Sequence, residues 1–490
     1  MVYMPRFSAA QNAFYLTVAA VFQKIVSFVY FTIVARALGV EDVGKYIFAL
    51  TFTTIFSVFV DMGLSPALSR EVARDNTQAE RHIQTTLFIK CLLALVVYGI
   101  VVVTVTILDY DTTIRQLVYL SGITMIFDSF HLTFYAAFRG FQNLRYEAYA
   151  VFASQVTTLV LGSLFLWYRM PLIYLIAAFA IPAGLNMMYA GTLLKIKYGI
   201  RLFPKTVQKK SIITLLGVAW AFALAGIFSR LYSYFDTVLL SKLVGTQAVG
   251  IYSIPNKIAF AFQFIPLALS ASIYPAMSAF FAVSREKVAR IFEDSMVYLM
   301  LAALPIAGGL FVLGPTIIIQ IYGIQYAASI TPLKILMGSM VFAFLSFPVG
   351  SLLNACNRQK TQTTIMGLTV VLNVLLNIAL IPRFGVSGAA IAALFGNCFL
   401  VIGGAVFLPR IAPIRILFLL RTLCLVLCAT LIMMFVVYKA QLFVHWTFSV
   451  PIGVFVYVLV LFVMRVIHKD HIALFKMLIK KQSISEVETL

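Results

Sequence analysis

Charged side chains inside long apolar segments are the first candidates for chemistry in this sequence. Five cations occupy such segments: Lys24, Lys90, Arg230, Lys257 and Arg421. A charge within a lipid bilayer is costly unless it faces a polar cavity or an opposite charge. Lysine and arginine also bind phosphate groups well. We therefore take Lys24, Arg230 and Lys257 as candidate ligands of an anionic group. For Lys90, Lys257 and Arg421, a helix end is near enough for the charge to reach the membrane interface instead.

Three carboxylates lie in the same kind of segment: Asp61, Asp128 and Asp236. Two roles suit them, namely binding a coupling Na⁺ or H⁺ and neutralising a nearby cation. Asp61 in "DMGLS" and Asp236 in "DTVLLS" lie near predicted helix ends, which favours charge pairing. His131 follows Asp128 by three residues and shares its helix face. A proton-sensitive Asp128–His131 pair is one interpretation, and an ordinary hydrogen-bonded histidine between helices is the favoured one.

Uncharged polar residues complete the candidate site, because they suit the hydroxyl groups of a sugar. Gln23, Tyr234 and Gln263 are the candidates for substrate binding, although such side chains also form hydrogen bonds between membrane helices. The sequence contains no Ser/His/Asp arrangement, no metal-binding spacing and no G-x-x-x-x-G-K-[ST] motif. It therefore predicts neither an enzyme nor a metal site nor a bound cofactor, apart from a coupling Na⁺ or H⁺.

Membrane-spanning helices are the elements that must position these residues. Hydrophobic residues make up 62% of the 490 residues and charged residues 11%, and the mean hydropathy is +1.00. A helix needs about 20 apolar residues to cross a bilayer. Fourteen segments qualify, near 10–35, 45–68, 83–107, 116–138, 148–168, 172–194, 212–240, 247–280, 295–321, 331–354, 362–381, 386–408, 416–438 and 446–467. We predict an all-α membrane protein with 14 transmembrane helices.

Positive charge is distributed unevenly between the predicted loops. The net charge is +20, and the chain has 37 lysines and arginines. With fourteen crossings, 24 of them lie on the side of the N-terminus, 8 on the opposite side and 5 within helices. By the positive-inside rule, both termini are cytoplasmic. Membrane orientation thus explains the basic charge, and nucleic acid is not an expected partner.

A short polar loop occurs twice in the chain, as "ARALGVEDVGKY" at 35–46 and "SKLVGTQAVGIY" at 241–252. The two copies align Gly39 with Gly245 and Gly44 with Gly250, at a constant offset of 206 residues. The repeat unit is six helices, an even number, so the copies predict two parallel six-helix lobes plus two C-terminal helices. We expect the glycines to permit tight turns or close backbone contacts between the first and second helices of each lobe.

The repeat also sets the predicted division of the chain. It gives an N-lobe at 1–200, a C-lobe at 201–410 that starts with a basic cytoplasmic linker, helices 13 and 14 at 411–467, and a cytoplasmic tail at 468–490. Lys24, Arg230 and Lys257 fall on helices 1, 7 and 8. These helices line the lobe interface if the two repeats face each other, which is why we group the three cations as one site.

Three pairs of stretches carry a family resemblance. They are "ARALGVEDVGKY" with "FVDMGLSPALSREVAR" (59–74), "FDTVLLSKLVGTQAVGIYSIPNKI" with "IPLALSASIYPAMS" (235–278), and "LNACNRQKTQTT" with "LNVLLNIALIPRFGVSGAAIAAL" (372–394). Each pair is a weak signal alone. In this order and at these helix numbers, the chain resembles the polysaccharide flippases, of the O-antigen type, of the multidrug/oligosaccharidyl-lipid/polysaccharide exporter superfamily.

The resemblance implies transport of an undecaprenyl-pyrophosphate-linked oligosaccharide from the cytoplasmic to the outer leaflet by alternating access. The process would be surface polysaccharide biosynthesis, such as that of O-antigen and lipopolysaccharide, in the cytoplasmic (inner) membrane of a prokaryote. Implied partners are the lipid-linked oligosaccharide and membrane lipids, with a glycan polymerase and chain-length machinery as further candidates.

Three alternatives stay open. A peptidoglycan lipid-precursor flippase and a multidrug or cation antiporter belong to the same superfamily. A membrane glycan polymerase is less favoured, because the predicted external loops are too short to form a catalytic surface. Basic residues at least match acidic ones within the predicted helices, which favours an anionic substrate over a cation.

Overall fold

The computed structural model describes residues 9–202 and 208–465. This part of the chain consists of helices joined by short loops and contains no strand. Thirteen helical segments in this part are long and apolar enough to cross a membrane. They become fourteen if Ser211–Trp220 and Phe222–Leu243, bent by 46° relative to each other, form one span. The prediction of an all-α, multi-pass membrane protein is therefore confirmed. The predicted tail at 468–490 lies outside the described residues.

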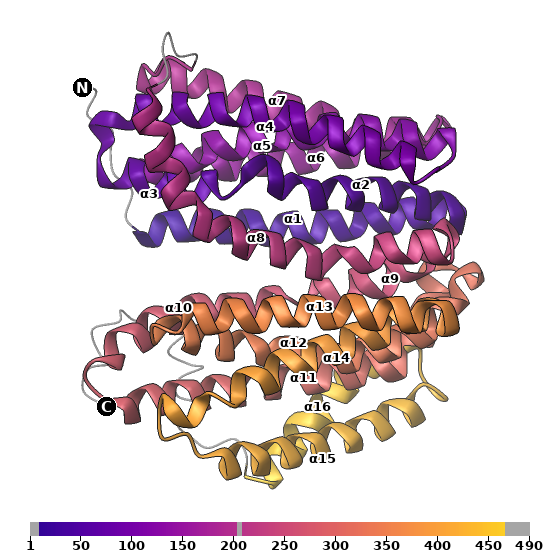
Figure 1. Ribbon diagram of the computed structural model, residues 1–490. Coiled ribbons are helices and arrows are strands. Elements are labelled where there is room, and N and C mark those ends of the chain that lie inside the picture. Colours follow the sequence, from indigo (N-terminus) through magenta and orange to yellow (C-terminus); the bar gives the residue numbers. More distant parts are fainter. Residues whose placement is uncertain (1–8, 203–207, 466–490) are drawn as a thin grey trace. The chain divides into compact units, whose positions relative to one another are not determined.

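The chain divides into two compact units, and the candidate site lies in the first of them. Figure 1 labels the helices of both units. Unit 1 comprises Met1–Phe264, Ile318–Pro332 and Thr363–Gly396, and unit 2 comprises Ile265–Ile317, Leu333–Gln362 and Asn397–Leu490. The helices of unit 1 are α1 (Ala9–Ala37), α2 (Val40–Asp61), α3 (Leu64–Arg74), α4 (Ala79–Ile107), α5 (Thr112–Gly140), α6 (Arg145–Trp167), α7 (Ile173–Tyr198), α8 (Lys209–Leu243) and α9 (Thr246–Ala261). The division into an N-lobe and a C-lobe stays a prediction.

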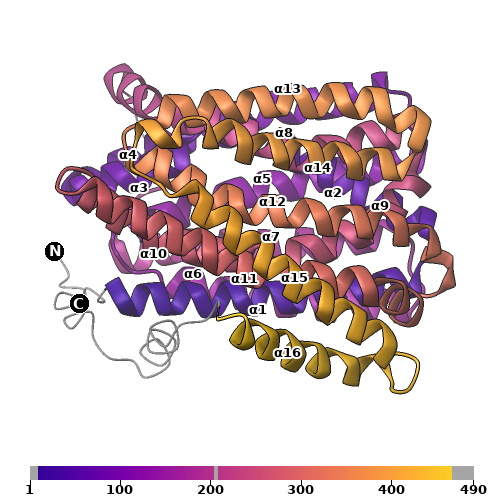
Figure 2. The same ribbon diagram turned by 90° about the horizontal axis from the view of Figure 1, so that it is seen from below.

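Unit 2 contains α10 (Phe264–Phe281), α11 (Arg285–Ile317), α15 (Ile416–Ala440) and α16 (Trp446–Val463), with most of α12 (Ile330–Ala355). Most of α13 (Gln359–Phe384) and the first half of α14 (Val386–Ala405) belong to unit 1. Within unit 2, α15 packs against both α11 and α16 (Figure 2). Arg415 fixes the start of α15, because its Nη2 donates to Glu293 Oε2 of α11 at 2.6 Å. This hydrogen bond raises the pKa of Arg415, so the guanidinium stays charged.

The second predicted span, 45–68, is broken into α2 and α3, which corrects the expectation of one continuous helix. The break lies at Met62 and Gly63, whose φ angles of 43° and 70° are left-handed. A Cβ on Gly63 would lie 2.4 Å from the carbonyl oxygen of Ala219 in α8. Glycine therefore meets two demands here, a left-handed backbone and close packing against α8. The eighth predicted span is likewise divided, between α9 and α10 at residues 262–263.

One end of unit 1 collects the basic loops that the sequence placed on the side of the N-terminus. Gln84 Nε2, near the start of α4, donates to Arg201 O beyond the end of α7 at 2.7 Å. Arg81 Nε donates to Ser211 Oγ near the start of α8, also at 2.7 Å. Arg139 at the end of α5 forms an ion pair with Glu147 at the start of α6. We call this the basic end of unit 1; that it faces the cytoplasm stays a prediction.

The two copies of the repeated loop pack against each other inside unit 1. A Cβ on Gly44 of α2 would lie 1.8 Å from Thr246 O, and a Cβ on Gly250 of α9 would lie 2.0 Å from Val40 O. The contact is reciprocal, because Val40 and Thr246 occupy equivalent positions in the two repeats. The glycines thus bring together α2 and α9, the helices that follow the two loops. The expected contact between the first and second helices of one repeat is corrected to a contact between the repeats.

Replacing Gly44 or Gly250 by alanine is expected to destabilise the protein strongly. The added methyl group overlaps backbone atoms that cannot rotate away, and such overpacking costs about 1–3 kcal/mol of unfolding free energy. Thermal unfolding of the purified protein in detergent measures the effect. Gly39→Ala is the matched control, since Gly39 has a φ of −69° and no atom within 4 Å of an added Cβ. An unfolding temperature for Gly44→Ala equal to that of Gly39→Ala would remove this account of the repeat.

Candidate functional site

A polar cavity of about 760 Å³ lies within unit 1. Its wall is formed by α1, α2, α3, α5, α6, α7 and α8. Cavities of roughly 300–1,000 Å³ are usual for small-ligand sites. Six residues singled out from the sequence line it: Gln23, Asp61, Asp128, His131, Arg230 and Tyr234. The fold therefore brings together, from four helices, residues that are far apart in the chain.

Arg230 and Tyr234 form the cationic part of this wall. They lie four residues apart on α8 and so share one helix face. The guanidinium carbon of Arg230 is 5.9 Å from the centre of the Tyr234 ring, within the range of a cation–π contact. Arg230 is the one lysine or arginine among the residues that line the described cavity. Its planar fork of N–H donors can bind a phosphate bidentately.

Hydroxyl and amide groups make up much of the remaining wall. They belong to Thr53, Thr54, Ser57, Ser121, Thr124, Ser129, Ser154, Gln155, Thr158 and Asn186, in addition to Gln23. The hydroxyls of Thr53 and Ser121 lie 2.7 Å apart, and Asn186 Nδ2 donates to Ser154 Oγ at 2.8 Å. Hydroxyls and amides both donate and accept hydrogen bonds. The wall therefore suits a ligand rich in hydroxyl groups.

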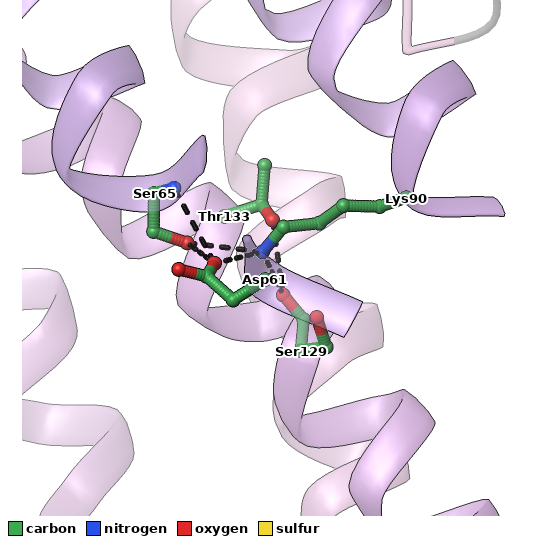
Figure 3. Close-up of polar contacts among 5 residues, drawn as sticks. All are labelled: Asp61, Ser65, Lys90, Ser129 and Thr133. Carbon is green, nitrogen blue, oxygen red and sulfur yellow. Dashed lines mark hydrogen bonds and ion pairs between the residues drawn. The ribbon is translucent and has the colours of Figure 1, made fainter. Parts of the chain in front are cut away.

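An ion pair lies beside the cavity at the break between α2 and α3 (Figure 3). Lys90 Nζ of α4 is 2.6 Å from Asp61 Oδ1. It also donates to Ser65 Oγ and to the carbonyl oxygen of Ser129, each at 3.0 Å. Ser65 in turn donates to Asp61 Oδ1 through its hydroxyl and its backbone N–H. The pair joins α2, α3, α4 and α5.

The two partners of this pair differ in their access to water. The side chain of Lys90 is fully buried, whereas that of Asp61 is 26% exposed and lines the cavity. The alternative that Lys90 reaches the membrane interface is therefore wrong, because the carboxylate of Asp61 compensates its charge inside the protein. Asp61 pairs with Lys90, and Arg230 and Asp128 are the other Lys, Arg, Asp or Glu residues on the wall of the described cavity.

Asp128 and His131 of α5 also face the cavity. His131 Nδ1 lies 3.5 Å from Asp128 Oδ1, and Asp128 is 48% exposed. His131 Nδ1 makes no hydrogen bond within the part of the chain that is described. The ring of His131 packs beside that of Tyr135, with centroids 5.0 Å apart. The contact with Asp128 is thus much looser than the Asp61–Lys90 pair.

Lys24 and Lys257 do not lie on the cavity wall. Lys24 is exposed on α1, next to Gln23, which does line the cavity. Lys257 of α9 donates to Ser27 Oγ of α1 at 3.0 Å and lies 5.5 Å from the centre of the Phe31 ring. The three cations grouped from the sequence therefore separate into Arg230 in the cavity and two lysines on α1 and α9.

Asp236 and Gln263 also lie outside the cavity. Asp236 of α8 is buried and accepts hydrogen bonds from the Tyr252 hydroxyl of α9 and from the backbone N–H of Thr237, each at 2.7 Å. These contacts tie α8 to α9. Gln263 lies at the break after α9, where its backbone N–H donates to Phe260 O at 3.2 Å.

Sequence patterns missed the role of Lys90 and most of the hydroxyl groups. The predicted span begins at residue 83, seven residues before Lys90, whereas α4 begins at Ala79, eleven residues before it. That is about 16 Å along a helix, too far from the end for its amine to leave the membrane easily. The hydroxyls gave no signal, since serine and threonine are common in apolar helices. Within the described ranges, no three His, Cys, Asp or Glu side chains group as a metal site.

Comparison with known protein families identifies the class of protein as a membrane transporter rather than an enzyme. The chain belongs to the polysaccharide biosynthesis protein family, whose model matches residues 9–281, more than half of its length. A second family model, MatE, matches residues 221–379. Both matches agree with the superfamily that the sequence stretches resemble, so the recognition of a polysaccharide flippase of this superfamily is confirmed.

Individual relatives are distant but cover most of the chain. The probable low-salt glycan biosynthesis flippase Agl15 of Haloferax volcanii is 22% identical over 388 residues, 78% of this chain and 80% of its own. A putative O-antigen transporter of Shigella dysenteriae is 21% identical over 75% of this chain and 91% of its own. Among solved structures, lipid II flippase MurJ in an inward closed conformation has a TM-score of 0.75 at 16% identity, covering 91% of this chain and 97% of that one.

Proposed function

We propose that the protein is a flippase that moves an undecaprenyl-pyrophosphate-linked oligosaccharide from the cytoplasmic to the outer leaflet for surface polysaccharide biosynthesis. The observation that carries this proposal is Arg230 on the wall of a cavity rich in hydroxyls and amides. The relatives in the same family support it, since two of them are described as a glycan flippase and an O-antigen transporter.

In this proposal the pyrophosphate and the sugars of the substrate bind different residues of the cavity wall. The pyrophosphate binds the guanidinium of Arg230, which forms stronger hydrogen bonds to an anion than a neutral donor does. The sugars bind hydroxyls and amides such as Thr54, Ser57 and Gln155. Because Lys90 neutralises Asp61, carboxylates do not dominate the cavity. We further propose that the protein lies in a prokaryotic inner membrane and acts beside a glycan polymerase. In the same proposal, transport is coupled to Na⁺ or H⁺.

A cation antiporter is the second candidate, and one observation favours it. Asp128 is about half exposed in the cavity, and a carboxylate there could bind an organic cation. The MatE match over 221–379 agrees with that alternative. A peptidoglycan-precursor flippase differs from our proposal only in the sugar, because its substrate is also a lipid-linked diphosphate.

Ligand-dependent thermal stability of the purified protein separates the flippase from the cation antiporter. A ligand at 100 times its Kd raises the free energy of unfolding by about 2.7 kcal/mol. We expect an oligosaccharide-diphosphate lipid to raise the unfolding temperature, and tetraphenylphosphonium, an organic cation, to leave it unchanged. Sugar-free phospholipid at equal concentration is the control. Stabilisation by the cation alone would favour the antiporter and overturn the proposal.

A further inference from the structure

A second hollow lies on the outer surface of α6 and α7. It has a volume of about 270 Å³ and is lined by Tyr149, Ala150, Ala153, Ser154 and Thr157 of α6 and by Pro182, Leu185, Asn186 and Tyr189 of α7. Its apolar side chains are open to the surroundings of the helices, since Tyr149 is 56% exposed, Leu185 55% and Tyr189 38%. In a membrane-spanning bundle, such a surface meets lipid chains. We call it the α6/α7 groove.

The groove and the polar cavity share part of their walls. Ser154, Pro182 and Asn186 line both. Asn186 donates to Ser154 Oγ at 2.8 Å and accepts from the Tyr135 hydroxyl at 2.7 Å. This short hydrogen-bonded partition between two helices separates the lipid side from the polar side. The groove therefore shares a wall with the cavity and is not an isolated surface feature.

A cationic cluster lies at the basic end of the same two helices. Arg145 Nη2 and Lys197 Nζ both donate to the hydroxyl of Tyr146, at 2.8 and 3.0 Å. Each cation also lies 4.7 Å from the centre of the Tyr146 ring. Two positive charges thus converge on a neutral phenol, one turn before Tyr149 at the start of the groove. From Arg145 to Ser154 is about 14 Å along a helix.

We propose that the α6/α7 groove is a loading site for the polyprenyl diphosphate part of the substrate. The diphosphate binds Arg145 and Lys197 there, with the isoprenoid chain along Tyr149, Leu185 and Tyr189, before it moves to Arg230 in the cavity. The arrangement matches the orientation of a lipid in the membrane, charged at the interface and apolar below it. Basic pockets between membrane helices also bind phospholipid head groups. The groove favours a polyprenyl lipid over a phospholipid, because it shares Ser154, Pro182 and Asn186 with the wall of the cavity that is proposed to take the sugars.

This inference rests on the proposed function, since it assigns a place to the lipid part of the same substrate. It is specific to α6 and α7, and it concerns residues that do not contact the sugar. The partition formed by Ser154 and Asn186 then lies between the bound lipid and the cavity wall that would take the sugars.

Binding of sugar-free undecaprenyl diphosphate to the full-length purified protein tests the inference. We expect Arg145→Gln with Lys197→Gln to weaken binding at least tenfold. Lys195→Gln is the matched control, because Lys195 is an exposed lysine in the last turn of the same helix, and it should bind as the wild type does. Equal affinities of the double variant and the control would overturn the inference.

Photo-cross-linking gives a second readout in a protein whose basic cluster is intact. A benzoylphenylalanine at Leu185 is expected to label undecaprenyl diphosphate, and one at Leu164, an exposed leucine of α6 outside the groove, is not. Labelling that phosphatidylglycerol suppresses at equal concentration would mean a general anionic-lipid site and would overturn the assignment. If the glycan lipid is translocated but Leu185 is not labelled, the groove fails alone. If Leu185 is labelled but nothing is translocated, the proposed function fails alone.

Discussion

An Arg230→Gln protein is expected to lose about 10- to 100-fold of its transport activity while folding normally. A hydrogen bond to a charged group contributes about 1.5–3 kcal/mol, and each 1.4 kcal/mol corresponds to about tenfold in affinity. The loss should be large because no second lysine or arginine lines the described cavity. Arg230→Lys should recover part of the activity, since it keeps the charge but not the bidentate fork.

Arg421→Gln is the matched control for this prediction. Arg421 is an exposed arginine within α15 of unit 2 and does not line the cavity, so its replacement removes the same charge elsewhere. Lys24→Gln should also have a smaller effect than Arg230→Gln. Delivery of the surface glycan, compared at equal amounts of membrane protein, measures all four variants. Wild-type delivery by Arg230→Gln would remove Arg230 from the site.

Asp61→Asn is expected to destabilise the protein more than Lys90→Met does. Breaking a buried ion pair from one side costs about 3–5 kcal/mol, because the other charge is left uncompensated. Asp61→Asn leaves the ammonium of Lys90, which is fully buried, without its carboxylate. Lys90→Met leaves Asp61, which is 26% exposed to the cavity, where water can solvate it. The free energy of unfolding should therefore fall more when buried Lys90 is left unpaired than when Asp61 is left unpaired.

The double variant completes this test. Asp61→Asn combined with Lys90→Met removes both charges, so it should be more stable than Asp61→Asn alone. Unfolding temperatures of the four proteins in one detergent give the coupling energy of the pair. Strictly additive effects of the two substitutions would show that the contact between Lys90 Nζ and Asp61 Oδ1 does not stabilise the fold.

The all-α, multi-pass architecture could be predicted because long apolar segments mark the helices that can cross a membrane. The breaks inside two predicted spans could not, since Met62 and Gly63 interrupt the helix without interrupting its apolar character. Gly63 is left-handed and packs closely against Ala219 of α8, where an added Cβ would not fit. That contact joins residues 156 positions apart in the chain, so no local pattern reports it.

The sequence also does not predict which face of each helix lines the candidate site. Gln23 and Lys24 are neighbours in the sequence, but successive residues point about 100° apart on a helix. Gln23 lines the cavity and Lys24 does not. α1 is apolar on all sides, so its sequence does not indicate which face meets the polar cavity. Likewise, the partner of Asp61 depends on the packing of α4 against α2 and α3, so the sequence leaves open whether Lys90 reaches the membrane interface.

Translocation by the purified protein in liposomes tests the central claim most directly. The vesicles would carry a labelled oligosaccharide linked to undecaprenyl diphosphate, and accessibility of the sugar from outside would be followed over time. We predict that wild-type protein speeds the appearance of the sugar in the opposite leaflet and that Arg230→Gln protein does so about 10- to 100-fold more slowly. Equal rates in vesicles with wild-type protein and in protein-free vesicles would contradict the account.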